Sequence, residues 1–327
     1  MNLRNILYLI VAIVLVACEN EEKLVSEPPV NGVTFVFPEG DDAWDHDLKE
    51  IADKFGTKCI YKNLTYDDFF RTWTAGSAVG STGEYIVSPL KDTRHIERYT
   101  RFFLDHIFAF LPAQCTEGVL PSYIYFAYDF CSVNLRPDIG LTYYGTSSTE
   151  MKWDGMGYWS FCFETEEHVD ILERPWQNTL GGDAEIILQK RDIVLRNIFK
   201  LMVEAGTLVP PAAFEVGGGL DYVTPVVSGT ANIGNENYYK RRGFPAQIIN
   251  YKNYVKPTDL RGIQNTGRLL TFIDYINLAL RFSKEQIYTD YADFPLVIQY
   301  YDLTVKHMKD VYGVDITKVA EMPEAFE

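Results

Sequence analysis

Apolar and polar positions alternate in two different ways along this chain, and the change falls near residue 180. Before it, short β-branched and aromatic runs predict strands, with helical patterns between them. The predicted strands cover residues 32–37, 58–61, 84–87, 118–133 and 155–163, and the predicted helices cover residues 41–55 and 93–111. Asp42 is a candidate N-cap of the first helix, and Gly56 is expected to end it. The first half is therefore predicted to be α+β.

Beyond residue 180, apolar residues recur at helical spacing. Long helices are predicted over residues 184–205, 259–282 and 292–312, and Ser283 is expected to open a shorter one. A glycine-rich stretch lies between the first two, but no Lys-Ser/Thr pair follows its glycines, so a long connecting loop is favoured over a phosphate site. We predict an N-terminal mixed α/β lobe over residues 32–180 and a mainly helical C-terminal lobe over residues 181–327.

The N-terminus has a pattern of its own. An apolar run from Ile6 to Ala17 follows Arg4, and it is too short to span a bilayer, which needs about 20 apolar residues. Its basic start and small-residue end are typical of a signal peptide. The end of the run, Leu15-Val16-Ala17-Cys18, resembles a bacterial lipobox, which implies cleavage before Cys18 and acylation of that cysteine. An ordinary signal peptide with a chance cysteine is the alternative. We predict a lipoprotein signal peptide over residues 1–17 and a lipid anchor at Cys18.

Residues 18–31 are acidic and polar and have no apolar period, which predicts a flexible tether. An acidic cluster directly after the lipidated cysteine resembles the surface-export tag of Bacteroidetes lipoproteins, although any hydrophilic linker would look similar. We therefore expect a protein of the outer membrane that is held by the Cys18 lipid and faces the cell surface.

The net charge of the chain excludes some classes of binding partner. The formal net charge is -15, and removal of the signal peptide makes it more negative by one, because that segment carries Arg4 and no acid. Nucleic acids and anionic lipids need clustered Lys and Arg, so neither is expected to bind. The short cluster Lys240-Arg241-Arg242 is interpreted as a solvated helix face.

Four cysteines follow Cys18, namely Cys59, Cys115, Cys131 and Cys162. In an exported protein they can form disulfides, but each also lies in an apolar context where a free cysteine packs as a small hydrophobe. Their pairing is left open. A zinc site built from them is disfavoured because no two are closely spaced.

Two histidines and two acidic runs are candidate metal ligands. His95 and His106 share a helix face but are about 16 Å apart at 1.5 Å per residue, too far to bind one metal. The run from Asp41 to Asp47 is dense enough for Ca²⁺, but it lacks the glycine and terminal Glu of an EF-hand, so helix capping is favoured. The run from Glu166 to Asp170 is interpreted as a solvated face.

Serine residues and exposed aromatic residues are two further kinds of candidate site. Ser228-Gly229 and Ser147-Ser148 lack the G-x-S-x-G context of a hydrolase nucleophile, and paired carboxylates for glycoside hydrolysis are not recognisable in one sequence. The aromatic residues near strand ends are candidates for stacking on sugars or holding peptides, with core packing as the alternative. They are Trp153, Tyr158, Trp159 and Tyr143-Tyr144.

The closing segment, Lys306-His307-Met308-Lys309-Asp310-Val311-Tyr312-Gly313-Val314-Asp315-Ile316, resembles the C-terminal signature of Bacteroidetes lipoproteins assigned as candidate zinc-binding metallopeptidases. Cys59-Ile60-Tyr61 and the stretch from Arg101 to Pro112 are consistent with the same family. The resemblance covers nearly the whole mature chain by order of elements. It implies a zincin-like fold, with HExxH on the first long C-terminal helix and an acidic ligand on the next.

The chain departs from that family where the chemistry would occur. The stretch from Val194 to Glu204 contains no histidine, and none lies between His168 and His307. A catalytic zinc needs about three N or O ligands, and Arg268 stands where the family has acids. The resemblance therefore implies a degenerate member without HExxH, and we assign no catalytic, cofactor-binding or metal-binding residue.

These observations favour a non-catalytic surface lipoprotein that binds a peptide or glycan, beside neighbouring surface uptake proteins. An active hydrolase, either a metallopeptidase or a carboxylate-based enzyme with an unrecognised site, is the alternative. A purely structural partner of other surface proteins is a third interpretation.

Overall fold

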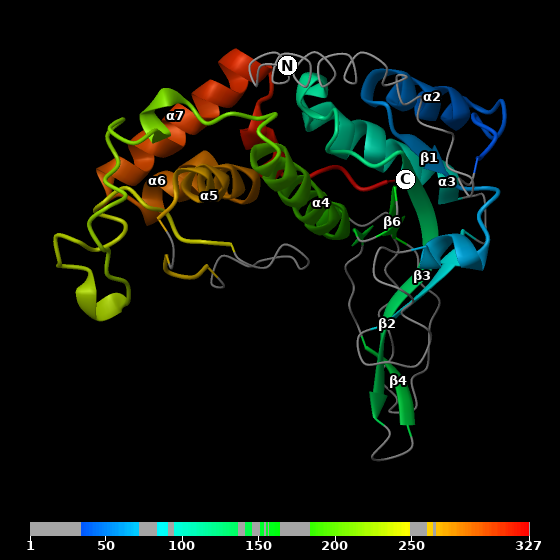
Figure 1. Cartoon of the computed structure of the whole chain (residues 1–327), viewed down its shortest axis with the longest axis horizontal. Helices are drawn as coiled ribbons and strands as arrows, with labels where there is room; N and C mark the ends of the chain where they lie inside the picture. Colours follow the sequence, from blue (N-terminus) through cyan, green and yellow to red (C-terminus); the bar gives the residue numbers. More distant parts are fainter. Residues whose placement is uncertain are drawn as a thin grey trace, which may run out of the picture. The chain divides into compact units, whose positions relative to one another are not determined.

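A six-stranded sheet organises the first half of the part of the chain that is described (Figure 1). Its central strands β1, β3 and β6 are parallel, with Cys59 opposite Ile124 and Ile124 opposite Trp159. β2 and β4 pair antiparallel with the far part of β3, and β5 pairs antiparallel with β6. The strands are β1 (Lys58–Ile60), β2 (Glu84–Pro89), β3 (Tyr123–Arg136), β4 (Leu141–Gly145), β5 (Met151–Lys152) and β6 (Tyr158–Cys162).

The structure, a computed structural model, describes residues 34–71, 84–90, 95–136, 141–145, 151–153, 155, 157–163, 184–248, 260–263 and 266–326. The described residues from Phe37 onward form one compact unit. The predicted signal peptide, the tether and the lobe boundary near residue 180 lie outside the described residues and stay predictions. No helix within these ranges is long and apolar enough to cross a membrane.

The strand predicted over residues 32–37 is wrong for its described part, because residues 34–37 form no strand. Glu39, which follows this segment, contacts the residues after β1 through its side chain. The Glu39 carboxylate accepts hydrogen bonds from the backbone N–H groups of Tyr61 (2.6 Å), Lys62 (3.0 Å) and Asn63 (3.0 Å). These bonds satisfy three consecutive backbone donors just after the end of β1.

Helix α2 (Ala43–Phe55) begins and ends where the sequence predicts. The Asp45 carboxylate accepts a hydrogen bond from the Asp42 backbone N–H at 3.0 Å, which forms the capping box, and Gly56 ends the helix at φ 73°. The hydroxyl of Tyr61 donates to the other Asp45 oxygen at 3.0 Å. Asp45, one of the acids in the run that resembles a Ca²⁺ site, therefore caps the helix.

The long helix predicted over residues 93–111 is interrupted. It consists of α3 (Ile96–Arg101), a π-helical turn over Phe102–Ile107 and a 3₁₀ turn over Phe108–Phe110. A π-turn shifts the helix face, so that the consecutive residues Phe102 and Phe103 are both fully buried. Their rings stack on strand residues, Phe102 on Phe161 (4.8 Å between centroids) and Phe103 on Phe126 (5.3 Å).

Among the described residues from 184 onward, four α-helices form near the predicted ranges. α4 (Ala184–Glu204) contacts α5 (Arg268–Arg281), which in turn contacts α7 (Pro295–Tyr312), and α6 (Lys284–Asp290) lies between α5 and α7 in the sequence (Figure 1). A 3₁₀ turn over Ile316–Ala320 packs on α4 and α5. α5 begins nine residues after the predicted start, because Arg261 forms an antiparallel bridge with Gln247 instead of joining the helix.

The buried side chains of both halves form one continuous core. The Tyr99 hydroxyl donates to the Ala127 carbonyl at 2.8 Å and accepts from the Phe163 N–H at 2.8 Å, so that one buried tyrosine ties β3 to the residue that follows β6. Cys59, Cys115 and Cys162 are buried free thiols, which supports the packing interpretation for these three. Burial raises the pKa of Cys59. The side chain of Cys131 lies outside the described residues.

Candidate functional site

The α4 helix, where the resemblance would place HExxH, carries a buried ion pair at its centre. Arg196 Nε donates to Asp192 Oδ2 at 3.0 Å, and the two side chains are 0% and 1% exposed. Burial raises the pKa of Asp192, while the Arg196 charge lowers it. Arg191 donates to the carbonyls of Val319 (2.6 Å) and Glu321, which ties the chain's C-terminal turn to α4. These charged groups bind one another and the backbone.

The histidines and the α5 position considered as metal ligands lie on separate elements of the structure. His95 precedes α3, and His106 lies in the π-turn, where burial lowers its pKa to about 4. His307 lies on α7, and its Nε2 is 2.9 Å from the Val209 carbonyl. Arg268 pairs with Glu215 at the start of α5. In the described ranges, no group of three or more His, Cys, Asp or Glu side chains could hold a metal ion.

The aromatic candidates at strand ends prove to be mainly core. Tyr158 is fully buried and its hydroxyl donates to the Phe69 carbonyl at 2.6 Å, and Trp159 is 6% exposed. Trp153 packs edge-on against Trp159 at 4.6 Å between centroids. The hypothesis of an exposed stacking surface is therefore wrong for Tyr158 and Trp159. The side chains of Tyr143 and Tyr144, the residues 147–148 and the residues 166–170 lie outside the described part.

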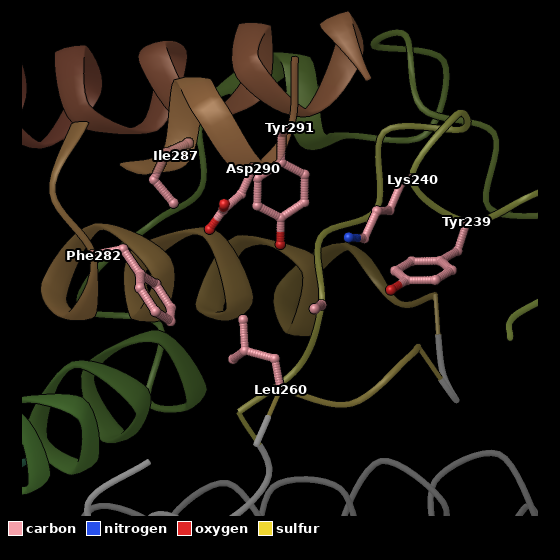
Figure 2. Close-up of a pocket in the computed structure, with 8 residues that line it drawn as sticks. Tyr239, Lys240, Leu260, Phe282, Ile287, Asp290 and Tyr291 are labelled. Atoms are coloured by element: carbon pink, nitrogen blue, oxygen red, sulfur yellow. The ribbon is translucent and has the colours of Figure 1, made fainter. Parts of the chain in front are cut away.

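The structure does form a cavity, of about 370 Å³, where the end of α5, the short helix α6 and the loop of residues 238–248 meet (Figure 2). We call it the Lys240 cavity. Its apolar lining comes from Ala246, Leu260, Phe282 and Ile287. Its polar lining comes from Tyr239, Lys240, Asp290 and Tyr291. The volume lies near the lower end of the range for small-ligand pockets.

A second cavity, of about 190 Å³, lies between α2 and the residues 104–109. Most of its lining is apolar and includes Ile51, Phe55, Leu104 and Phe108. It is smaller than the Lys240 cavity and presents fewer groups that fix the orientation of a ligand. The Lys240 cavity is therefore the better candidate site.

One wall of the Lys240 cavity depends on the turn from α5 into α6. Phe282 closes α5, with its N–H donating to the Leu278 carbonyl at 2.9 Å, and the Ser283 hydroxyl accepts from the Gln286 N–H at 3.2 Å to cap α6. α6 is short, and the Tyr291 N–H bonds to the Ile287 carbonyl at 3.0 Å just after its end. This arrangement holds Asp290 and Tyr291 beside each other at the cavity.

The loop of residues 238–248 forms the opposite wall and is fixed to α5. The Tyr275 hydroxyl donates to the Gly243 carbonyl at 2.7 Å. The backbones of Gln247 and Arg261 exchange hydrogen bonds of 2.8 and 3.1 Å. Gly243 has φ 79°, and a Cβ there would lie 2.7 Å from a Leu220 methyl, so the loop requires glycine at this position.

Lys240 packs among aromatic rings rather than on a solvated helix face. Its ammonium lies 4.6 Å from the ring centroid of Tyr291, 5.5 Å from that of Phe294 and 6.0 Å from that of Tyr239. Burial lowers the pKa of Lys240, and the Asp290 charge raises it. Within the described residues, Lys240 forms no ion pair or hydrogen bond through its side chain.

The predicted role of Lys240-Arg241-Arg242 is thus wrong, because these residues form a turn and not a helix. Arg241 donates to the Ile233 carbonyl at 2.8 Å, and Arg242 pairs with Asp221 at 2.8 Å. The two arginines fix the loop, whereas the lysine faces the cavity.

The two tyrosines of the cavity keep their protons at neutral pH. Burial raises the pKa of Tyr291 to about 12, although a hydrogen bond with the Ala246 backbone lowers it, and burial also raises the pKa of Tyr239. The cavity therefore offers neutral hydroxyls, one ammonium and one carboxylate beside an apolar surface. Such a set can bind and orient a small polar ligand.

Comparison with known proteins adds little to this geometry. No family model matches the sequence, and no curated protein matches it. Among solved structures, the chain is similar to a candidate zinc-binding metallo-peptidase from Bacteroides caccae, with 11% identity and a TM-score of 0.41 over 85% of this chain and 88% of that one. At this level the likeness is distant and carries no information about activity. The mixed α and β architecture is confirmed by the strands and helices themselves, whereas the zincin-like layout and the family resemblance stay predictions.

Proposed function

We propose that this chain is a lipoprotein of the outer membrane, anchored at Cys18 and exposed at the cell surface, that binds a peptide or glycan without cleaving it. The observation that carries the binding proposal is the Lys240 cavity, in which aromatic rings and two opposite charges converge on one space. The support for the anchor is the lipobox-like sequence that ends at Cys18.

The cavity lining favours binding over hydrolysis. It contributes one carboxylate, Asp290, whereas hydrolysis of a glycosidic bond by carboxylates needs two. We also propose that the zinc site of the resembled family has been lost, with the Asp192–Arg196 pair in its place on α4. An arginine at the centre of that helix would repel a metal cation. Elemental analysis of the chain purified without chelator is expected to find no stoichiometric zinc, and about one zinc per chain would contradict the proposal.

The binding proposal is tested by screening the full chain, purified in mild detergent, against peptide and oligosaccharide libraries. Leu260 lines the cavity, so Leu260→Trp fills part of the space, while Leu270→Trp adds the same ring at a site on α5 that is 37% exposed. We expect hits whose affinity falls at least about tenfold in Leu260→Trp and stays unchanged in Leu270→Trp. A screen without hits, or hits that both variants bind equally, would overturn the proposal.

A further inference from the structure

The two charged residues of the Lys240 cavity differ in sign and in setting. Lys240 is half-buried against aromatic rings, and Asp290 is exposed at the rim. They are close enough for Asp290 to raise the pKa of Lys240, yet they form no ion pair with each other. Within the described residues, neither forms an ion pair with any other side chain. The cavity therefore presents a separate positive and negative group to one ligand.

The rings place these charges on two sides of one surface. Figure 2 shows the Lys240 ammonium pointing toward Tyr291 from one side, with the Asp290 carboxylate on the other. Phe282 and Ile287 line the cavity next to Asp290, but at 3% and 1% exposure they offer little open surface, whereas the apolar side chain of Leu260 is half-buried. A ligand beside Tyr291 would thus meet a cation at one end, an anion at the other and the Leu260 side chain.

From this arrangement we infer that the Lys240 cavity takes a short zwitterionic peptide, whose free carboxylate pairs with Lys240 and whose free ammonium pairs with Asp290. The inference rests on the proposed binding function and names the ligand class for the same site. Charge-assisted hydrogen bonds at both ends would fix the orientation of the peptide. An apolar side chain of the peptide would pack on Leu260, the half-buried apolar residue of the lining, where burial of apolar area is favourable.

The same two charges disfavour a glycan. An acidic sugar would pair with Lys240 but would bring its negative charge close to Asp290, and like charges in one site repel. A neutral sugar would offer only hydroxyl groups to Lys240 and Asp290, and these bind a charged group more weakly than an opposite charge does. A ligand with both charges avoids the repulsion and gains the stronger pairing at both ends.

The test uses calorimetric titration of the full chain in mild detergent with four forms of the dipeptide Leu-Leu: free at both ends, N-acetylated, C-amidated, and blocked at both ends. We expect the free form to bind and each block to weaken binding about tenfold, as loss of a charged hydrogen-bond partner does. In Lys240→Gln the C-amide should bind as well as the free acid, and in Asp290→Asn the N-acetyl form should bind as well as the free amine.

Lys62→Gln, which removes an exposed lysine outside the cavity, is the matched control and should behave as the wild type does. Thermal unfolding of each variant shows that it is folded before its binding is interpreted. Equal binding of free and blocked dipeptides would overturn the inference. Glycan binding that depends on Lys240, without dipeptide binding, would also overturn it and leave the proposed function standing. If no peptide and no glycan binds the folded chain, the inference and the proposed function are both wrong.

Discussion

The ammonium of Lys240 lies 4.6 Å from the ring centroid of Tyr291. Lys240 belongs to the loop of residues 238–248, and Tyr291 follows the short helix α6, so the contact joins two segments that are far apart in the sequence. A cation over an aromatic ring gains about 0.5–2 kcal/mol, which partly offsets the loss of hydration of the lysine. The contact keeps a charged group in the cavity, where it is available to a ligand.

The lipid anchor is the first prediction. Wild-type protein should fractionate with the outer membrane, incorporate labelled palmitate and be cleaved by protease added to intact cells. Cys18→Ser removes the acylated thiol and should abolish labelling and membrane retention, while Asn20→Ser, two residues away, should change neither. Retention of Cys18→Ser in the outer membrane would contradict the prediction that a lipid on Cys18 anchors the protein.

The buried ion pair on α4 leads to a second prediction. Asp192→Ala removes the carboxylate that pairs with the fully buried Arg196, and we expect the free energy of unfolding to fall by about 3–5 kcal/mol. Replacing both charges, as Asp192→Leu with Arg196→Met, removes the charges together and should cost much less than the single change. Urea denaturation of the three proteins measures these differences. A double variant that is as unstable as Asp192→Ala would contradict this account of the pair.

Asp274 on α5 leads to a pH prediction. The residue is 5% exposed, and its Oδ2 has no hydrogen-bond partner among the described residues. Burial raises the pKa of this carboxyl well above its usual range, although a hydrogen bond with Gln247 lowers it. The unfolded chain loses this proton near pH 3.9, about the ordinary value, while the folded chain keeps it to higher pH. Stability from this group is therefore fully present below pH 3.9 and falls as the pH rises, by up to about 1.4 kcal/mol per pH unit.

Asp274→Asn tests this effect, because the amide has the same shape and carries no charge at any pH. We expect the variant to be more stable than the wild type at pH 7, with a difference that shrinks as the pH is lowered to 4. Asp53→Asn on the exposed face of α2 controls for the loss of a surface charge. Urea denaturation across this pH range gives the comparison, and a difference that is constant with pH would show that Asp274 is not the source.

Gly243 links stability to ligand binding. Gly243→Ala combines an unfavourable φ of 79° with a Cβ that would lie 2.7 Å from Leu220, whereas Gly217→Ala has a similar φ of 88° and open space around it. We expect Gly217→Ala to cost about 1 kcal/mol and Gly243→Ala roughly 2–3 kcal/mol. Only Gly243→Ala should also weaken ligand binding, since Gly243 lies in the loop that presents Lys240. Equal losses in both variants would mean that the Leu220 contact is not important.

The elements that the sequence predicts well are those with local signals. Asp42 and Gly56 bracket α2 because a capping carboxylate and a left-handed glycine act within one helical turn. α4 ends one residue before the predicted limit, and Ser283 caps α6 as expected, for the same reason. The π-turn after Arg101 was missed, because it depends on two adjacent phenylalanines packing against β6 and β3. No periodic pattern in a single sequence contains that information.

The candidate site was missed for a related reason. In the sequence, Lys240 stands out only as part of a basic triplet, which predicts a solvated helix face. Its aromatic environment comes from Tyr291 and Phe294, which lie beyond α5. The run Tyr238-Tyr239-Lys240, in which aromatic residues precede the lysine, was the one local signal available. Tyr158 and Trp159 illustrate the opposite error, since their aromatic character reflects packing in the sheet core.

Hydrogen–deuterium exchange of the full chain, with and without the tightest peptide from the library screen, tests the central claim most directly. The account predicts slower exchange in residues 238–248 and 284–291, which form the two walls of the Lys240 cavity, and no change in α2 or α4. Protection on α4 or α2 without protection of these two segments would place the ligand elsewhere and contradict the assignment of the site.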